Sequence, residues 1–496
     1  MSNATTRLPR ELYRAADVRR LDALAIEGHG IPGLTLMGRA GGAVFNTLMT
    51  RWPEARRVLV CCGSGNNGGD GYIVATLAQQ RGLAVTVLAA TDPARLQGDA
   101  ASVWEDARAA GVPVVPWEGR LMDRPDVIVD ALLGTGLDRA VEGTYAEVID
   151  AINDAGAPRL AVDIPSGLHA DSGRVLGRAV KADVTVSFIG LKQGLFTGDG
   201  PDHAGTVAYH DLEVPEDVRA AVAPAALRLG PGPGQPLMTS RPRNAHKGLF
   251  GHVLVVGGNT GMAGASRMAG VAALRAGAGL VSVATVPQAP APPEPELMAR
   301  GVAGARDLEP LLERATVVAV GPGLGTDDWG REMFEACLGA ERPLVVDADA
   351  LNLLAFEGGS RDDWVLTPHP GEAGRLLGTS AAAVQADRFA AVAELRRRYG
   401  GTVVLKGCGT LVAGPGLPVG VCTAGNPGMA SGGMGDLLTG VIAGLMAQRL
   451  GAPEAARAGV WIHGAAGDRA ARRGERGLVA TDLLEGIREG VNGHGG

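Results

Sequence analysis

The sequence predicts an α/β protein of two domains, each built on a parallel β-sheet. With 496 residues, the chain is long enough for two large domains at roughly 100–200 residues each. Continuous apolar runs alternate with helical patterns, which is typical of strands buried on both faces of a parallel sheet. Two glycine-rich loops, 63–71 and 432–436, lie far apart in the chain. Each adjoins an apolar run, so each could present backbone N–H groups to an anion.

In the first half, predicted helices and strands follow one another in order. Apolar periodicity places helices between short runs rich in valine, leucine and isoleucine. The predicted helices are 14–27, 34–50, 72–80, 99–110 and 145–155, and the predicted strands are 57–62, 84–89, 112–117, 126–132, 159–164 and 184–188.

The stretch 221–239 is rich in proline and glycine, which indicates a linker. We expect a first domain over 1–225, a linker over 226–239 and a second domain over 240–496. The alternating pattern then resumes without an internal repeat. The second half is expected to contain strands at 252–256, 280–285, 316–320, 344–347, 364–367 and 402–405.

Composition excludes several classes of protein. The net charge is −7 and no basic block stands out, so we expect no nucleic-acid partner. No apolar run reaches the roughly 18 residues of a membrane span, and the first 20 residues lack the apolar core of a secretory signal. The five cysteines are odd in number and lack metal-ligand spacing, which favours buried, reduced thiols. These features predict a cytoplasmic enzyme.

The first glycine-rich loop has two interpretations. Residues 63–68 read Gly-Ser-Gly-Asn-Asn-Gly, a match to the dinucleotide fingerprint, and Asp92 stands near the position of its expected acid. Against this, a carboxylate at Asp70 would compete with a pyrophosphate for the N–H groups of the helix start. The segment 66–70 is therefore better interpreted as a polar floor with amide ligands.

Two further motifs follow strands in the first half. One is Asp-Ala-Leu-Leu-Gly-Thr-Gly-Leu at 130–137, and the other is Asp-Ile-Pro-Ser-Gly at 163–167. The carboxyl ends of parallel strands converge at one edge of a sheet. Amides, carboxylates and a hydroxyl gathered there would suit a hard cation. Taken singly, each aspartate is better explained as a helix or turn cap, but three such motifs at three strand ends of one sheet weaken that explanation.

Residues 1–225, through these three motifs, resemble the epimerase domain of the NAD(P)H-hydrate repair enzymes. The resemblance implies a Rossmann-like three-layer domain that interconverts the R and S epimers of hydrated NADH and NADPH. It implies K⁺ binding by Asn67, Asp130 and Ser166, and proton transfer by Asp163 and Lys192; without the resemblance, Lys192 could be a surface lysine. The implied substrate contacts are Asn66, Asn67, Gly68, Gly69, Asp70, Gly134, Thr135, Gly136, Leu137, Asp138, Arg139, Ala140 and Asp163.

The second half carries its own set of motifs. Gly-Gly-Met-Gly-Asp at 432–436 precedes an apolar helix, where N–H groups could stabilise a transferring phosphoryl group and Asp436 could accept a proton. The same loop could also be a capped turn. His369, in Thr-Pro-His-Pro-Gly-Glu, is a candidate ligand, although a lone histidine is more often structural. Three other glycine-rich motifs, each directly after a predicted strand, are 257–265, 321–325 and 406–410.

From Ser240 onward, these motifs together resemble the ADP-dependent (S)-NAD(P)H-hydrate dehydratase domain, which has a ribokinase-like fold. The resemblance implies dehydration of the S hydrate while ADP becomes AMP and phosphate, with Mg²⁺ offsetting the phosphate charge. Met434 departs from the family, which commonly has serine or threonine there. Asp436 is the implied catalytic base, Ala265, Gly323, His369 and Asp436 are the implied substrate contacts, and Lys406, Gly407, Cys408, Gly409, Thr410 and Gly435 are the implied nucleotide contacts.

Three hypotheses follow. The first is a bifunctional repair enzyme acting on hydrated NADH and NADPH, with ADP and AMP as nucleotides and a homo-oligomeric assembly as in the family. The second is a ribokinase-like kinase of a vitamin precursor fused to a nucleotide-sensing domain, which leaves the first-half motifs unexplained. The third makes the first half a nucleotide-binding interaction module without catalysis.

Overall fold

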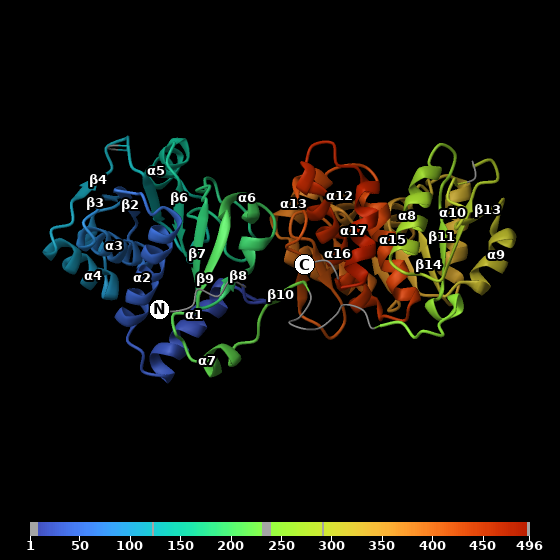
Figure 1. Ribbon diagram of the computed structural model, residues 1–496, viewed down its shortest axis with the longest axis horizontal. Coiled ribbons are helices and arrows are strands. Elements are labelled where there is room, and N and C mark those ends of the chain that lie inside the picture. The colour runs from blue at the N-terminus through green and yellow to red at the C-terminus, as the bar shows by residue number, and fades with distance from the viewer. Residues whose placement is uncertain (1–7, 122–123, 231–239, 290–291, 494–496) are drawn as a thin grey trace. The chain divides into compact units, whose positions relative to one another are not determined.

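The computed structural model describes residues 8–121, 124–230, 240–289 and 292–493. The chain divides into two compact units, one ending at Leu227 and the other beginning at Arg228 (Figure 1). The expected linker begins with a short strand, β10 (Ala226–Arg228), and its residues 231–239 lie outside the described residues. The domain limits drawn from the sequence therefore stay a prediction.

In the described part of the first unit, one parallel sheet has the order β4-β3-β2-β5-β6-β7-β9. The order reverses direction between β2 and β5, the place where ligands bind in open α/β sheets. The first six strands were predicted, and β9 was missed. The strands are β2 (Arg57–Cys62), β3 (Ala84–Ala89), β4 (Val114–Pro116), β5 (Val127–Ala131), β6 (Arg159–Val162), β7 (Val184–Phe188) and β9 (Thr206–His210).

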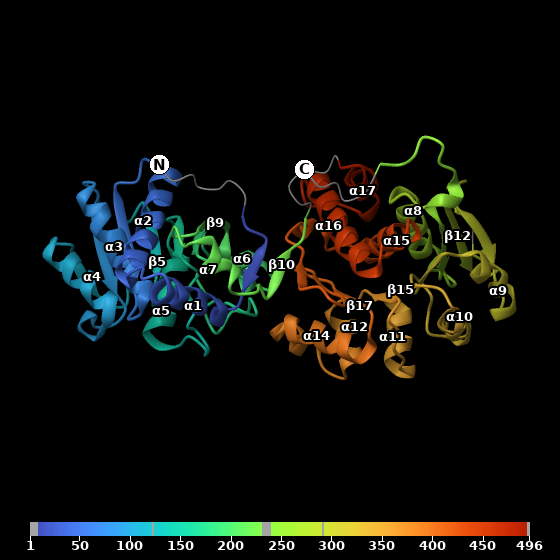
Figure 2. The ribbon, with the colours of Figure 1, turned by 90° about the horizontal axis from the view of Figure 1, so that it is seen from below.

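Successive side chains of a central strand enter two different cores. Val58 and Val60 of β2 pack with helices α2 and α3, whereas Leu59 and Cys61 pack with helix α5. The sheet is thus covered on both faces, as its continuous apolar strands predict (Figure 2). The helices of this unit are α1 (Ala15–Ala23), α2 (Gly33–Arg51), α3 (Asn66–Gln80), α4 (Gly98–Ala109), α5 (Gly143–Asp154), α6 (Gly200–Ala204) and α7 (Glu216–Ala220).

Helix α3 begins earlier than the sequence predicts. The predicted start was Tyr72, because five glycines in the preceding nine residues indicate a turn, but the helix begins at Asn66. The glycines serve close packing instead: a Cβ at Gly71 would lie 2.6 Å from the Cβ of Ala131 on β5. The polar segment 66–70 is therefore the first turn and a half of a helix whose N-terminus faces the strand ends.

Three short strands of the first unit were also missed. β1 (Glu11–Tyr13) runs parallel to β8 (Leu191–Lys192) and antiparallel to β10, and Tyr13 lies opposite Lys192. Strands of two or three residues carry too little alternation to be recognised from sequence. This pairing places α1, which starts two residues after β1, beside the segment that carries Lys192.

The described strands of the second unit include a parallel run of order β13-β12-β11-β14-β15-β16-β17, extended by antiparallel β18 and β19. The order reverses at β11 and β14. β13, β18 and β19 were not predicted. The strands are β11 (His252–Val256), β12 (Leu280–Thr285), β13 (Met298–Gly301), β14 (Val317–Val320), β15 (Leu344–Val346), β16 (Trp364–Leu366), β17 (Thr402–Leu405), β18 (Leu411–Ala413) and β19 (Val419–Val421).

Helix α15 crosses the core of the second unit with nearly all its residues buried, and it packs tightly on α8. Its first turn carries Asp436, so a rigid helix positions that carboxyl. The helices are α8 (Ala263–Arg275), α9 (Ala305–Arg314), α10 (Asp328–Gly339), α11 (Ala348–Glu357), α12 (Pro370–Leu377), α13 (Ala381–Ala386), α14 (Arg388–Tyr399), α15 (Met434–Ala447), α16 (Ala452–Ala470) and α17 (Leu483–Val491).

The five cysteines are unbridged, and four of them, Cys61, Cys62, Cys337 and Cys422, are buried. Burial raises the pKa of each of these four thiols above its usual range. Cys408 is the exception and is exposed. Among the described helices, none is both long and apolar enough to cross a membrane.

Candidate active sites

The first unit contains a cleft of about 830 Å³ at the carboxyl ends of β2, β5 and β6. The three strand-end motifs meet there, as the sequence predicts. Asn66, Asn67 and Asp70 contribute from α3, Lys192 contributes from β8, and the loop after β5 lines one wall. The predicted contacts from that loop and from the next strand end are Gly134, Thr135, Gly136, Leu137, Asp138, Arg139, Ala140 and Asp163.

Gly68 and Gly69 have a different place. A Cβ at Gly69 would meet the sulfur of Met37 on α2 at 2.8 Å, and one at Gly68 would overlap the backbone of Gly63. Both glycines therefore allow α3 to approach its neighbours closely. Their predicted role in substrate binding stays a prediction.

Lys192 and Asp163 form a buried ion pair in the cleft. The Lys192 side chain is fully buried, so the alternative of a surface lysine is wrong. Its ammonium also donates to the carbonyl of Phe188 at 3.2 Å, and the Phe188 amide donates to the Asp163 carboxylate at 3.1 Å. Asp163 has a φ of 65°, a left-handed conformation that costs a residue with a Cβ about 1 kcal/mol or more. Such strain is concentrated at functional sites.

Asp130 and Ser166 lie beneath the cleft and are fully buried. The carboxylate of Asp130 accepts hydrogen bonds from the Ser166 hydroxyl at 2.6 Å and from the Ser166 amide at 2.8 Å. Burial raises the pKa of Asp130 to about 6, against the lowering effect of these hydrogen bonds. Asn67 is also buried, and its amide nitrogen has no partner among the described residues.

The structure adds a carboxyl that sequence analysis missed. Asp22 of α1 lines the same cleft as Asp70 and the Lys192–Asp163 pair. Val18, Asp22 and Ile26 recur every four residues, so one face of this helical segment points into the cleft. That spacing was visible in the sequence, but nothing in the sequence showed that this face borders a site.

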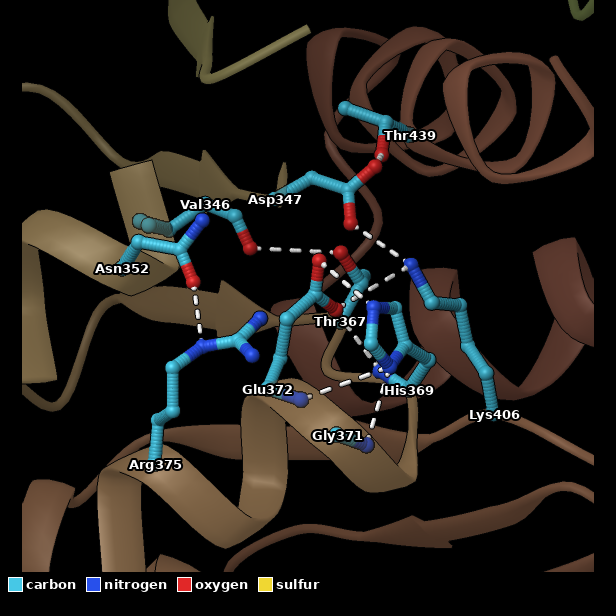
Figure 3. A network of polar contacts seen from close by, with 10 residues as sticks. All are labelled: Val346, Asp347, Asn352, Thr367, His369, Gly371, Glu372, Arg375, Lys406 and Thr439. Atoms are coloured by element: carbon cyan, nitrogen blue, oxygen red, sulfur yellow. Dashed lines mark hydrogen bonds and ion pairs between the residues drawn. The ribbon is translucent and has the colours of Figure 1, made fainter. Parts of the chain in front are cut away.

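In the second unit, Lys406 and Asp347 form the centre of a polar network (Figure 3). The Lys406 ammonium lies 2.7 Å from one oxygen of Asp347, and the hydroxyl of Thr439 donates to the other oxygen at 2.8 Å. Burial alone would raise the pKa of Asp347, but the ammonium and the hydrogen bonds bring it below its usual range. Asp347 and Thr439 were not predicted as site residues.

His369 caps the start of α12. Its ring nitrogen Nδ1 accepts from the amides of Gly371 and Glu372, and the Glu372 carboxylate accepts from the His369 amide at 2.8 Å (Figure 3). His369 therefore has a structural role as a helix cap, while half of its side chain stays exposed and could contact a ligand. Burial raises the pKa of Glu372 to about 7, with Lys406 opposing the shift. Glu372 is the last residue of the Thr-Pro-His-Pro-Gly-Glu motif, but it was not predicted as a site residue.

Asp436 lies in the first turn of α15. The residue directly before this helix is Gly433, whose φ of 91° suits glycine. Burial and the nearby Asp347 raise the pKa of Asp436 to about 7, and Lys406 opposes them. A Cβ at Gly435 would lie 3.2 Å from the Lys406 ammonium, so that ammonium stands at the N-terminus of α15. Positive charge and helix N–H groups thus meet beside one carboxyl, which suits phosphoryl transfer.

The other predicted residues of the second unit fall around this centre in two places. A Cβ at Gly323 would lie 3.2 Å from the Cβ of Ala265, which brings those two predicted substrate contacts together. Lys406, Gly407, Cys408, Gly409 and Thr410 form the loop after β17, and the buried Arg388 donates to the carbonyls of Leu405 and Lys406 beneath it.

Comparisons with known proteins give the family of each unit. Residues 33–194 match the family described as YjeF-related protein N-terminus, and residues 253–489 match the family described as NAD(P)H-hydrate dehydratase. The chain is 51% identical over 485 residues to the bifunctional NAD(P)H-hydrate repair enzyme Nnr of Coxiella burnetii, covering 97% of this chain and 99% of that protein. It is 44% identical over 489 residues to the enzyme of the same name from Escherichia coli, covering 98% and 95%.

Fold and sites thus define a two-domain α/β enzyme with a separate cleft or polar centre at the strand ends of each sheet. The match extends over nearly the full length of both chains. The chain belongs to the family of bifunctional NAD(P)H-hydrate repair enzymes. This assignment confirms the predicted fold class and resemblance, and it disfavours the hypotheses of a vitamin-precursor kinase and of a non-catalytic module.

Proposed function

We propose that this chain repairs hydrated nicotinamide cofactors in two reactions. The first unit interconverts the R and S epimers of hydrated NADH and NADPH, and the second unit dehydrates the S form while ADP is converted to AMP and phosphate. One observation carries the proposal: the chain matches, over nearly its whole length, enzymes named for the repair of NAD(P)H hydrates. The buried charged groups of each unit supply chemistry of the required kind.

Epimerisation requires a carbon–oxygen bond to be broken and made again on the other face of the ring. The hydrate carries its hydroxyl and its ring nitrogen on the same carbon, so protonation of the hydroxyl allows water to leave. In this proposal, the Lys192–Asp163 pair holds and moves the proton, which contributes about 10²–10⁴-fold in rate. The pair is buried and fixed by neighbouring backbone groups, which supports that role.

A K⁺ ion is proposed next to this cleft, with Asn67, Asp130 and Ser166 as its oxygen ligands. The buried amide of Asn67 has one end without a partner among the described residues, and the carboxylate of Asp130 is fully buried. Turning the amide would direct its oxygen toward a cation. A bound K⁺ would supply positive charge beside that carboxylate. The donor set of amide, carboxylate and hydroxyl oxygens fits a hard cation.

The substitution Asn67→Ala tests this site. It is expected to weaken K⁺ dependence and to slow epimerisation, since one oxygen ligand is lost. Epimerisation rates would be measured against K⁺ concentration, with Na⁺ held at constant ionic strength. A variant that works at the wild-type rate in K⁺-free buffer would contradict the cation assignment.

In the second unit, Asp436 is proposed as the base that accepts the proton of the substrate hydroxyl while the terminal phosphoryl group of ADP is transferred to it. The phosphorylated oxygen is then a good leaving group, and the ring nitrogen supports its departure. Lys406 and the N-terminus of α15 are placed to stabilise the phosphate charge. We also propose that Ala265, Gly323 and His369 contact the substrate.

Mg²⁺ is proposed to accompany ADP. Mg²⁺ is usually held by one or two carboxylates together with nucleotide phosphates. Asp349 lies near Asp436, close enough to raise its pKa, and is proposed as such a carboxylate; one of its oxygens accepts a hydrogen bond from the Gly325 amide at 2.9 Å. The nucleotide contacts would come from the loop 406–410 and from Gly435. We further propose a homo-oligomer acting in the cytoplasm.

A single assay tests the proposed function. Purified protein would be mixed with both epimers of hydrated NADH, Mg²⁺ and ADP, and NADH absorbance would be followed together with AMP. Full conversion of both epimers, with AMP equal to NADH, is the expected result. If conversion stops after the S epimer, the protein has no epimerase activity. If no NADH forms with either ADP or ATP, the proposal is overturned.

A further inference from the structure

The cleft of the first unit contains more acid–base groups than the Lys192–Asp163 pair. Asp22 from α1 and Asp70 from α3 line the same cavity. Asp163 is engaged by an ammonium and a backbone amide. By contrast, the carboxyls of Asp22 and Asp70 have no hydrogen bond or ion pair within the described part of the chain. Two half-buried carboxyls without direct partners at an active site call for an explanation.

The position of Asp22 is fixed by the strand pairing that precedes its helix. Tyr13 of β1 lies opposite Lys192 of β8, and the Ala15 amide at the start of α1 donates to the Asp171 carboxylate at 2.7 Å. A Cβ at Gly190 would lie 3.3 Å from a methyl group of Val18. Helix α1 is thus held against the segment that carries Lys192, with Asp22 one turn beyond Val18 on the cleft face.

The surroundings of Asp22 favour a carboxyl that exchanges its proton near pH 6. Burial raises the pKa of Asp22 to about 6, Lys192 lowers it and Asp163 raises it. Burial also raises the pKa of Asp70 above its usual range, with Asp163 and Asp22 adding to the effect. The charged and titratable side chains that line the cleft are Arg19, Asp22, Asp70, Asp99, Asp138, Arg139, Glu142, Tyr145, Asp163 and Lys192.

We infer that Asp22 is a second acid–base group of the epimerisation cleft, reaching the substrate from a different element than the Lys192–Asp163 pair. The inference rests on the proposed epimerase function. An epimerisation needs a proton delivered to the hydroxyl that leaves and a proton removed from the water that adds on the other face. Two separate groups meet that need, because a single group would have to serve both faces.

In the proposed epimerisation, Asp22 acts first and the Lys192–Asp163 pair acts second. The Asp22 carboxyl gives its proton to the departing hydroxyl, the carbon–oxygen bond breaks with its electron pair on oxygen, and water leaves. The ring nitrogen shares its lone pair with the carbon. Water then adds to the other face, and its proton passes to the carboxylate of Asp163, which is the proton acceptor of the Lys192–Asp163 pair. The reverse epimerisation uses the two groups in exchanged roles.

The test compares three variants of the full chain: Asp22→Asn, Asp22→Glu and Glu27→Gln. Asp22→Asn retains size and removes the titrating proton. Glu27 is exposed, lies in the turn directly after α1 and is absent from the residues that line the cleft, so Glu27→Gln is the matched control. For each variant, epimerisation would be measured against pH with the uncatalysed rate subtracted. Dehydration of pure S epimer reports the integrity of the other unit.

The expected result is a fall of about 10²-fold or more in kcat for epimerisation in Asp22→Asn. Its KM and its dehydration rate should stay near those of the wild type, and Asp22→Glu should recover part of the rate with a shifted pH profile. Epimerisation by Asp22→Asn within about twofold of the Glu27→Gln control would overturn the inference, as would a loss seen only in KM. A wild-type protein that does not epimerise would instead overturn the proposed function.

Discussion

Asp347 is buried and Asp436 is half-buried beside the same lysine, and the pKa values of their carboxyls shift in opposite directions. The Lys406 ammonium contacts Asp347 directly, and hydrogen bonding there holds the pKa of Asp347 below its usual range. Asp436 has no such contact, so burial and the charge of Asp347 raise its pKa to about 7. Asp347 is therefore suited to hold Lys406, whereas Asp436 is suited to exchange a proton near neutral pH.

The dehydration rate should depend on pH through Asp436. A base must be deprotonated to act, and the pKa of Asp436 is raised to about 7, so kcat/KM for the S epimer should fall as pH drops below about 7. Asp436→Asn should lower the rate by about 10²–10⁴-fold and remove this pH dependence. Initial rates of NADH formation at a series of pH values provide the measurement.

Glu372 supplies the comparison for that experiment, since its pKa is also raised to about 7 by burial. Glu372→Gln should keep the loss of rate at low pH, because its carboxyl caps α12 through the His369 amide and is not the proposed base. Loss of the pH dependence in Glu372→Gln, with retention in Asp436→Asn, would transfer the role of base to Glu372.

At the scale of elements, the close contact between α2 and α3 positions the polar start of α3. A Cβ at Gly41 on α2 would lie 2.5 Å from the Cγ2 of Ile73 and 3.1 Å from the carbonyl oxygen of Asp70. Gly38, one turn earlier on the same helix, is exposed and has open space around it. These two glycines separate the effect of helix packing from that of helix propensity.

Gly41→Ala should destabilise the first unit by roughly 1–3 kcal/mol, because the added methyl group overpacks the contact with α3. It should also slow epimerisation, since α3 carries Asn67 and Asp70. Gly38→Ala should be neutral or stabilising by up to about 1 kcal/mol, because alanine favours an exposed helix position. Denaturant unfolding and epimerisation assays would be run on both variants. Equal stabilities would show that α2 can move away from α3 at little cost.

Longer elements were predictable from sequence, and short ones were not. β2, β3 and β7 have the predicted limits because each is a short run rich in valine and other apolar residues. β1 and β8 have three residues or fewer, and their pairing is a tertiary effect that no local pattern records. The start of α3 was mispredicted because glycines were interpreted as a turn, when they serve close packing against neighbouring strands and helices.

Site residues were predictable from sequence where they belong to one contiguous motif. The strand-end motifs around Asn67, Asp130 and Asp163 converge because neighbouring strands β2, β5 and β6 carry them. Asp22 was not predictable, since its helix meets the cleft only through the β1–β8 pairing. Asp347 was not predictable as a site residue, because its contact with Lys406 joins residues 59 positions apart.

At the scale of the whole molecule, each unit has its own site and the two proposed reactions use different residues. Asp163→Ala should stop conversion after the S fraction, whereas Asp436→Ala should epimerise but form no NADH. Mixing the two variants should restore conversion of both epimers, because the S hydrate can pass through solution between proteins. NADH formed from an epimer mixture would be followed for each variant and for the mixture.

The control for this experiment is a protein carrying both substitutions, which should remain inactive when mixed with buffer. A mixture that still stops after the S fraction would mean that the intermediate does not pass from one protein to another. Complementation at the wild-type rate would show that linkage of the two units in one chain is not needed for turnover.

The distribution of the cysteines gives the natural sequence a built-in attachment point for a spectroscopic probe. Four thiols are buried with raised pKa values, and the exposed Cys408 stands in the loop 406–410 proposed to contact the nucleotide. A maleimide dye should therefore label the folded protein at one position without any mutagenesis. Its fluorescence would follow ADP binding directly, in an experiment that requires neither hydrate epimer nor turnover.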